Sequence, residues 1–252
     1  MARSMTTALV AAGILLTAFG ARAQSGFELT ISSAQPAVRQ TASGEARVSL
    51  PGAGITAEPG QPALPTQVVR VAVPPDVDPT SVRVSVEPLS VREFEGRHDV
   101  RPAPARAMIG RTELDHGQFA ERLVNGRDPV VYGSDDLFPA QWGSSSASLG
   151  GLRRYRFVTV TLHPVRYRPA SGRLEHAEGF RLQVSYVRNR SVDVLTANDC
   201  GGERLAARLL ANHEQARAWY SDSCMGPPVE PTGLAIITTA STGNAAAALS
   251  GL

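Results

Sequence analysis

Val158-Thr-Val-Thr-Leu162 and, further on, Phe180-Arg-Leu-Gln-Val-Ser-Tyr186 are the stretches that decide the fold of this chain. In both, every second side chain is large and apolar, which is the period of a half-buried β-strand. The connection between them carries Pro164, Pro169 and Gly172, residue types that favour turns. The segment therefore predicts two β-strands around a turn.

Similar alternation occurs in several places upstream. The apolar members are Phe27, Leu29 and Ile31, then Ala46, Val48 and Leu50, and then Val82, Val84 and Val86. Residues 66–73 are apolar on both faces, which predicts a central strand. Glycine and proline cluster between these runs, as they do in antiparallel sandwiches and barrels. We therefore expect a mainly β protein, built as an antiparallel β-sandwich or barrel.

Residues 97–150 interrupt this pattern with prolines, glycines and a Ser/Gly-rich end at 143–151. So long a stretch without periodicity is typical of a functional loop region, although residues 113–124 could form a short helix. Arginines recur in it at positions 97, 101, 106, 111, 122 and 127. The chain contains no lysine, so a compositional bias of the source is the alternative explanation for these arginines.

The pattern changes near residue 198. One amphipathic helix is predicted from Glu203 to Tyr220. The members of its apolar face are Leu205, Leu209, Ala216 and Trp219. Residues 226–231 form a proline-rich linker, residues 233–238 predict a buried strand, and residues 241–252 begin an alanine-rich helix. Strand, turn and helix in this order are how an α/β layer begins.

Residues 1–23 have the features of a secretory signal peptide: Arg3, an apolar core at 8–19, and Ala21-Arg-Ala23 as the cleavage site. Cleavage after Ala23 makes Gln24 the mature N-terminus. The apolar core is too short to span a bilayer, so we expect no membrane span once the signal is removed. The formal net charge of +2 is too small to suggest a nucleic-acid partner.

The two cysteines, Cys200 and Cys224, suit an exported protein. A disulfide between them would close a loop of about 25 residues, worth about 3–4 kcal/mol in the chain-entropy model, and free thiols are the alternative. No histidine pair has a metal-ligand spacing. Asp135-Asp136 offers oxygen ligands without an EF-hand frame. We expect no cofactor or metal, with calcium as a weak alternative.

Two sets of residues resemble a known family. The first is a G-x-P-x-L-P motif and the strand end after it: Gly60, Pro62, Leu64 and Pro65, then Val71, Val73 and Pro74. The second is a P-V-x-Y-x-P-x-x-G-x-L turn: Pro164, Val165, Tyr167, Pro169, Gly172 and Leu174. In this order and spacing they resemble the N-terminal propeptide domain of gingipain-type cysteine peptidases, and the resemblance runs from about Gly60 to the C-terminus.

The resemblance implies a propeptide that assists the folding of its peptidase and keeps it latent, with the cognate catalytic domain as partner. The signal peptide predicts a location outside the cytoplasm: secreted, periplasmic or on the cell surface. Residues 232–252 resemble the first strand and helix of the family's caspase-like catalytic domain. The family's catalytic histidine and cysteine lie further downstream, so no catalytic residue is carried over to this chain.

We therefore expect a signal peptide at 1–23, a β-sandwich propeptide-like domain at 24–197, a helix and linker at 198–231, and a truncated start of an α/β domain at 232–252. If the parent peptidase cleaves after arginine, a loop arginine could occupy its specificity pocket through a bidentate pair with a carboxylate. The candidates for this inhibitory role are Arg106, Arg111, Arg122 and Arg127. A solvated loop is the alternative for these arginines, and a free-standing secreted β-sandwich that binds a ligand or scaffold is the alternative for the whole chain.

Overall fold

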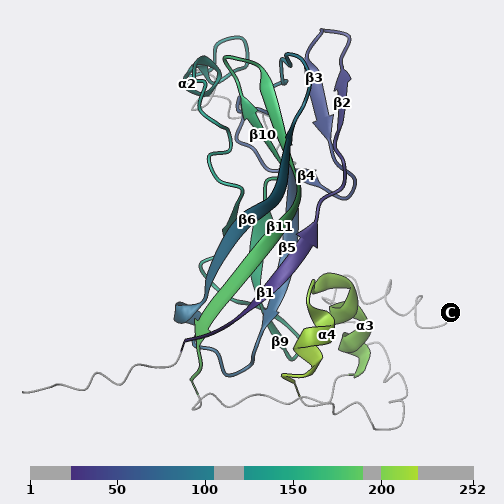
Figure 1. Ribbon diagram of the computed structural model, residues 1–252, viewed down its shortest axis with the longest axis vertical. Helices are drawn as coiled ribbons and strands as arrows, with labels where there is room; N and C mark the ends of the chain where they lie inside the picture. The colour runs from purple at the N-terminus through teal and green to yellow at the C-terminus, as the bar shows by residue number, and fades with distance from the viewer. Residues whose placement is uncertain (1–23, 105–121, 190–199, 221–252) are drawn as a thin grey trace, which may run out of the picture.

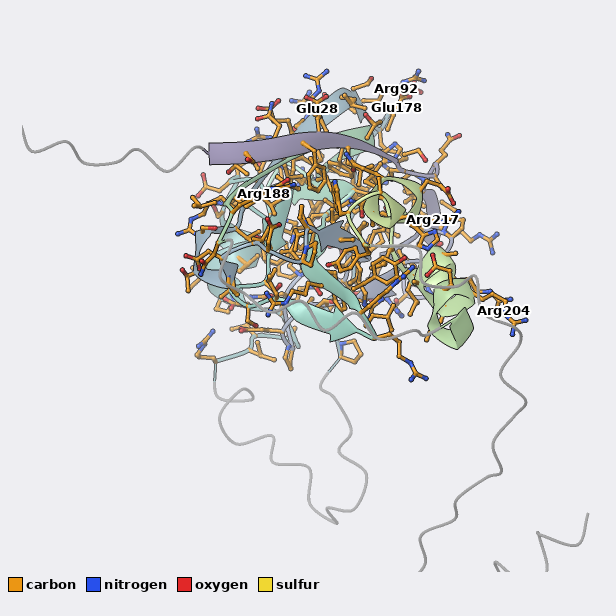
Figure 2. The ribbon with its side chains drawn as sticks, turned by 90° about the horizontal axis from the view of Figure 1, so that it is seen from below. Glu28, Arg92, Glu178, Arg188, Arg204 and Arg217 are labelled. Atoms are coloured by element: carbon orange, nitrogen blue, oxygen red, sulfur yellow. The ribbon has the colours of Figure 1, made fainter. Side chains whose placement is uncertain are left out.

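Two antiparallel sheets pack face to face in the computed structural model, which describes residues 24–104, 122–189 and 200–220 (Figure 1). In the first sheet, the long strand β11 (Arg173–Val187) lies in the middle. Strands β1 (Gln24–Ser32) and β10 (Val165–Arg168) pair with one edge of β11, and β6 (Arg83–Glu93) pairs with the other. The outer side of this sheet is polar, and Arg92 and Glu178 form an ion pair there (Figure 2).

The second sheet is built around β9 (Tyr155–Leu162), which pairs along its length with β5 (Pro65–Val73). Three short strands complete it: β4 (Gly54–Ile55), β7 (Gly143–Ser145) and β8 (Gly150–Leu152). A separate hairpin and short helices complete the described elements: β2 (Ala37–Gln40), β3 (Ala46–Ser49), η1 (Pro79–Ser81), α2 (Pro129–Gly133), α3 (Cys200–Leu209) and α4 (His213–Arg217). None of the described helices is long and apolar enough to cross a membrane.

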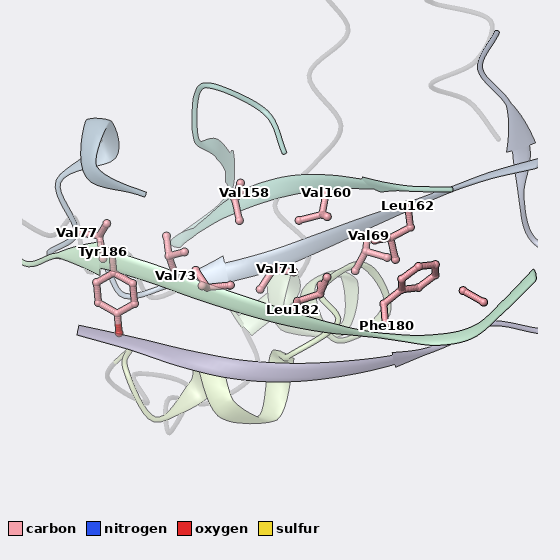
Figure 3. Packing of buried hydrophobic residues seen from close by; sticks show 12 residues of the cluster. Val69, Val71, Val73, Val77, Val158, Val160, Leu162, Phe180, Leu182 and Tyr186 are labelled. Carbon is pink, nitrogen blue, oxygen red and sulfur yellow. The ribbon is translucent and has the colours of Figure 1, made fainter. Parts of the chain in front are cut away.

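The main core lies between the two sheets (Figure 3). It includes the alternating residues predicted from the sequence in two strands, Val158, Val160 and Leu162 from β9 and Phe180, Leu182, Val184 and Tyr186 from β11. Val69, Val71 and Val73 from β5 also belong to it, as do Val77 and Ala177. Between the core residues of β11, Arg181 and Gln183 are exposed. The predicted mainly antiparallel β fold is therefore confirmed, and removal of these side chains from water stabilises it.

The two predicted strands form as β9 and β11, but they do not pair with each other. Strands β9 and β11 belong to different sheets, and the chain crosses between the sheets at His163 and Pro164. The hairpin that forms is β10 with β11, and the Pro164 carbonyl accepts a hydrogen bond from Ala177 N at 2.9 Å at its base. Alternation identifies the buried face of a strand but not the sheet in which the strand pairs. The Ser/Gly-rich run, expected to be a loop, supplies β7 and β8 instead.

The single helix predicted from Glu203 to Tyr220 is also wrong, because the helix breaks between Leu209 and His213. At the break, Ala211 N donates to Arg70 O at 2.9 Å, so the backbone there pairs with the free edge of β5. The predicted apolar face is also wrong in part, since Leu205 and Leu209 are exposed. The residues of this region that are buried against the second sheet are Ala206, Leu210, Ala216 and Tyr220. The backbone hydrogen bond to β5 interrupts the helix, although the spacing of the apolar residues favours a continuous one.

Candidate functional site

The Gly60–Pro65 motif joins the two chain segments that flank residues 105–121. On the upstream side, Ala63 N donates to Arg101 O at 3.0 Å, and Ala103 N donates to Gln61 O at 2.7 Å. On the downstream side, Asp128 N donates to Gly60 O at 3.0 Å. We call residues 60–63, 101–103 and 124–128 the loop frame. Both ends of residues 105–121 are therefore anchored to one turn.

Gly60 is required at this meeting point because its φ is +85°, a conformation that costs other residues about 1–2 kcal/mol. A Cβ atom at this position would lie 2.3 Å from Leu123 Cδ2 and 3.2 Å from Asp128 N. The next two motif residues, Pro62 and Leu64, are buried, and Pro62 forms a β-bridge with Pro102. The motif residues thus pack against the chain that leads into residues 105–121 and the chain that leaves them.

The downstream side of the loop frame is a tight turn. Val124 and Arg127 exchange two backbone hydrogen bonds, of 2.9 and 3.0 Å, around Asn125 and Gly126, which both have positive φ. Asn-Gly at these positions suits a turn with two left-handed residues. Asp128 then caps α2 by accepting a hydrogen bond from Val130 N at 3.0 Å. The backbone that leaves residues 105–121 is fixed by these bonds.

Arg127 is the charged centre of the loop frame. Its guanidinium donates to Asp99 at 2.6 and 3.0 Å and to Glu45 at 2.7 Å. It also lies 4.8 Å from the centre of the Tyr132 ring, and the Tyr132 hydroxyl donates to Val100 O at 2.7 Å. The hydrogen bond with Asp99 raises the pKa of Arg127 above its usual value, so the side chain stays charged.

The other inhibitory candidates are placed differently. Arg122 is largely exposed and pairs with Asp128 at 3.3 Å. Arg106 and Arg111 lie outside the described residues, as does most of the helix predicted at 113–124. Arg127 is occupied in the loop frame, because its guanidinium binds Asp99 and Glu45 inside the domain.

The second motif supports the same region from the other sheet. Tyr167 is buried, and its hydroxyl donates to His98 O at 2.7 Å. Gly172 has a φ of +73° and accepts from His98 N at 2.8 Å, and a Cβ there would lie 2.4 Å from Arg97 Cγ. Pro164 and Pro169 are both buried. Two motifs about 100 residues apart therefore converge on residues 97–103, just before residues 105–121.

A second polar cluster joins the helices to the second sheet. Glu203 on α3 accepts hydrogen bonds from the Tyr155 hydroxyl at 2.9 Å and from Arg154 at 2.8 Å, and lies 2.8 Å from His213 Nε2. Burial tends to raise the pKa of Glu203, but the hydrogen bonds from Tyr155 and His213 and the charge of Arg154 outweigh burial and lower it. Asn212 completes the attachment, accepting from Ala72 N at 2.8 Å and donating to Ala72 O at 3.0 Å.

The remaining sequence candidates have local roles or lie outside the described residues. Asp135 accepts from Ser171 N at 2.9 Å, and Asp136 accepts from the Ser134 hydroxyl at 2.8 Å. Within residues 24–104, 122–189 and 200–220, no group of three His, Cys, Asp or Glu side chains could hold a metal. Cys200 begins α3. Cys224, the signal with Ala23, and residues 232–252 lie outside the described ranges, whereas Gln24 is the first residue of β1.

Sequence reasoning missed several of the polar residues that build the two clusters. Glu45 and Asp99 have no local sequence signal, and Glu203 is marked only as the start of a predicted helix. Their partners lie far away in the chain: Glu45 and Arg127 are 82 positions apart, and Ala72 and Asn212 are 140 positions apart. No local pattern marks such pairs, because only the tertiary fold brings them together.

These features define a mainly antiparallel β-sandwich domain in which a hydrogen-bonded frame holds the two chain segments that flank residues 105–121. A family profile described as Propeptide_C25 matches residues 23–215. The chain belongs to this family, the propeptides of gingipain-type cysteine peptidases. The resemblance found in the sequence is thereby confirmed for the propeptide.

Two solved structures are similar to this chain. One is the complex of the Porphyromonas gingivalis RgpB pro- and mature domains, 22% identical with a TM-score of 0.50, over 76% of this chain and 92% of that chain. The other, on the zymogenic latency of gingipain K from Porphyromonas gingivalis, is 19% identical with a TM-score of 0.48, over 67% of this chain and 94% of that chain. The comparison with curated proteins gave no match. The first similarity supports the fold.

Proposed function

We propose that this chain assists the folding of a gingipain-type cysteine peptidase and keeps that peptidase latent during export. Its partner is the cognate catalytic domain. Family membership supports this proposal, as do the similar structures, one of a pro- and mature-domain complex and one concerned with zymogenic latency. The inhibitor acts by covering the active-site face of the peptidase and blocking the entry of substrate.

The observation that carries the proposal is the loop frame. The motif residues Gly60, Tyr167 and Gly172 all contact the backbone that flanks residues 105–121. A segment anchored at both ends enters a peptidase cleft with less loss of conformational entropy than a free chain. If the peptidase cuts it, both new ends remain attached to the folded domain and stay in the cleft.

An arginine from this segment supplies specificity in the proposal. A guanidinium that pairs with a carboxylate at the bottom of a desolvated pocket contributes both affinity and selectivity. Arg127 is bonded to Asp99 and Glu45 inside the domain, which favours Arg106, Arg111 or Arg122 as the inhibitory residue. In this proposal Arg127 stabilises the loop frame and does not enter the specificity pocket of the peptidase.

The organisation of the chain follows from the same proposal. Residues 1–23 direct export, and cleavage after Ala23 leaves a mature protein that begins with Gln24, the first residue of β1. The sandwich extends to residue 197, the helices and linker to residue 231, and the catalytic domain starts at residue 232. The precursor is secreted into the periplasm, to the cell surface or beyond it.

The test uses the chain from Gln24 onward together with the mature cognate peptidase. We expect the wild-type chain to inhibit the peptidase, and Arg→Ala at one of Arg106, Arg111 and Arg122 to raise the inhibition constant at least tenfold, the scale of a lost charged hydrogen bond. Arg39→Ala, on the β2–β3 hairpin, is the control. Absence of inhibition by the wild-type chain would refute the latency role. Equal inhibition by all the arginine variants would refute the arginine mechanism alone.

A further inference from the structure

Helix α3 presents its large apolar side chains outward. Leu205 and Leu209 are 45% and 38% exposed, whereas the side facing the second sheet carries Ala206, which is fully buried. An ordinary amphipathic helix directs leucine toward the core and small or polar residues toward solvent. In α3 the arrangement is the opposite: the leucines face solvent and the alanine faces the sheet.

The orientation of α3 is fixed by polar contacts. Glu203 on its inner side bonds to Tyr155 and Arg154, and Asn212 just beyond it bonds to the Ala72 backbone. A rotation that buried Leu205 or Leu209 would remove the Glu203 carboxylate from these donors. The exposure of both leucines is therefore a property of the docked helix.

Two arginines flank the leucines. Arg204 and Arg208 are exposed and have no ion pair among the described residues, and Arg204 extends away from the body of the molecule (Figure 2). The only acidic residue of α3, Glu203, faces inward. We call Arg204, Leu205, Arg208 and Leu209 the α3 outer face: an apolar pair beside two positive charges that no described residue pairs with.

We propose that the α3 outer face is a second contact with the catalytic domain of the same precursor, at an apolar patch bordered by carboxylates. This inference rests on the proposed function. The face lies toward the opposite end of the sandwich from α2, which adjoins the loop frame (Figure 1). A partner held at both places is bound bivalently, and a second contact raises affinity without any change at the first.

The position of the face in the chain favours this partner. Helix α4 ends at Arg217 and the described residues end at Tyr220. Residues 221–231 precede the proposed start of the catalytic domain. Eleven residues span at most about 36–40 Å, so a tethered domain reaches α3 at high effective concentration. A second copy of this chain fits less well, because a symmetric contact would bring the arginines of both copies together.

The test compares two double variants of the chain from Gln24 onward. Leu205→Ser with Leu209→Ser removes the apolar pair. Leu89→Ser with Val91→Ser, on β6, is the matched control, since those side chains are 46% and 45% exposed. We expect the first variant to raise the inhibition constant for the mature peptidase at least tenfold, and the control to change it less than about threefold.

A charge variant keeps the test independent of folding. Arg204→Glu with Arg208→Glu leaves the leucines and the inner side of α3 intact, and should slow association and reduce its dependence on salt. If the wild-type chain inhibits and all these variants inhibit equally, the inference is overturned while the proposed function stands. If the wild-type chain does not inhibit, the proposed function itself fails. A wild-type dimer in sedimentation that the leucine variant loses would assign the face to self-association and overturn the inference.

Discussion

Replacement of Asn212 by alanine should undock the helices from the second sheet. The Asn212 side chain satisfies both the N–H and the carbonyl of Ala72, at 2.8 and 3.0 Å, and Ala72 is fully buried. Each buried backbone group left without a partner costs about 1–3 kcal/mol. Because water can reach part of the opened site, we expect a total loss of about 3 kcal/mol. In a domain of this size that corresponds to a fall in Tm of about 6–12 °C.

Asn212→Asp sharpens this prediction because it changes one atom. The carboxylate can still accept from Ala72 N, but its other oxygen faces the Ala72 carbonyl, so we expect a similar loss. Arg208→Ala, on the exposed side of the same helical pair, should stay within about 0.5 kcal/mol. Thermal unfolding followed by circular dichroism measures these differences, and trypsin should cut the undocked helices sooner. Wild-type Tm and trypsin resistance in both Asn212 variants would refute the attachment described above.

Two further predictions concern the loop frame and the Glu203 cluster. Gly60→Ala should lower the free energy of unfolding by about 2 kcal/mol and weaken inhibition, because it combines an unfavourable φ with a clash. Gly96→Ala, with the same φ of +85° and no atom within 4 Å of the added Cβ, should lose only the conformational part, and equal losses in both would contradict the packing argument. The lowered pKa of Glu203 makes its contribution to stability complete above the unfolded pKa of about 4.3 and lost as pH falls further. The Tm difference between wild type and Glu203→Gln should therefore be largest near neutral pH and shrink below about pH 4; a difference that does not change with pH would contradict it.

Much of the fold could be predicted because the alternation of apolar and polar side chains along a strand identifies its buried face. Val158, Val160 and Leu162 point into the core as predicted, and so do Phe180, Leu182 and Val184. The same reasoning failed where pairing decides the outcome. Nothing local shows that β9 and β11 belong to different sheets, or that the backbone at Ala211 pairs with β5 instead of continuing a helix.

The candidate site could be predicted in part. Gly60 and Gly172 were singled out as motif residues, and both have a positive φ at a close approach of two backbones. The arginines of the irregular stretch could not be told apart from sequence. Only the structure separates Arg127, held by Asp99 and Glu45, from the exposed Arg122.

The mainly β class, the buried faces of the strands and the resemblance to a propeptide family can be predicted from the amino-acid sequence, because they depend on local periodicity and on turn residues at fixed spacing. Three other features depend on the folded structure: which segments the two motifs join, which arginine forms ion pairs inside the domain, and which side of α3 faces solvent. Those outcomes depend on contacts such as Ala72 with Asn212 and Glu45 with Arg127. Such contacts exist only in the folded structure, and they join residues too far apart in the chain for any local pattern to reveal them.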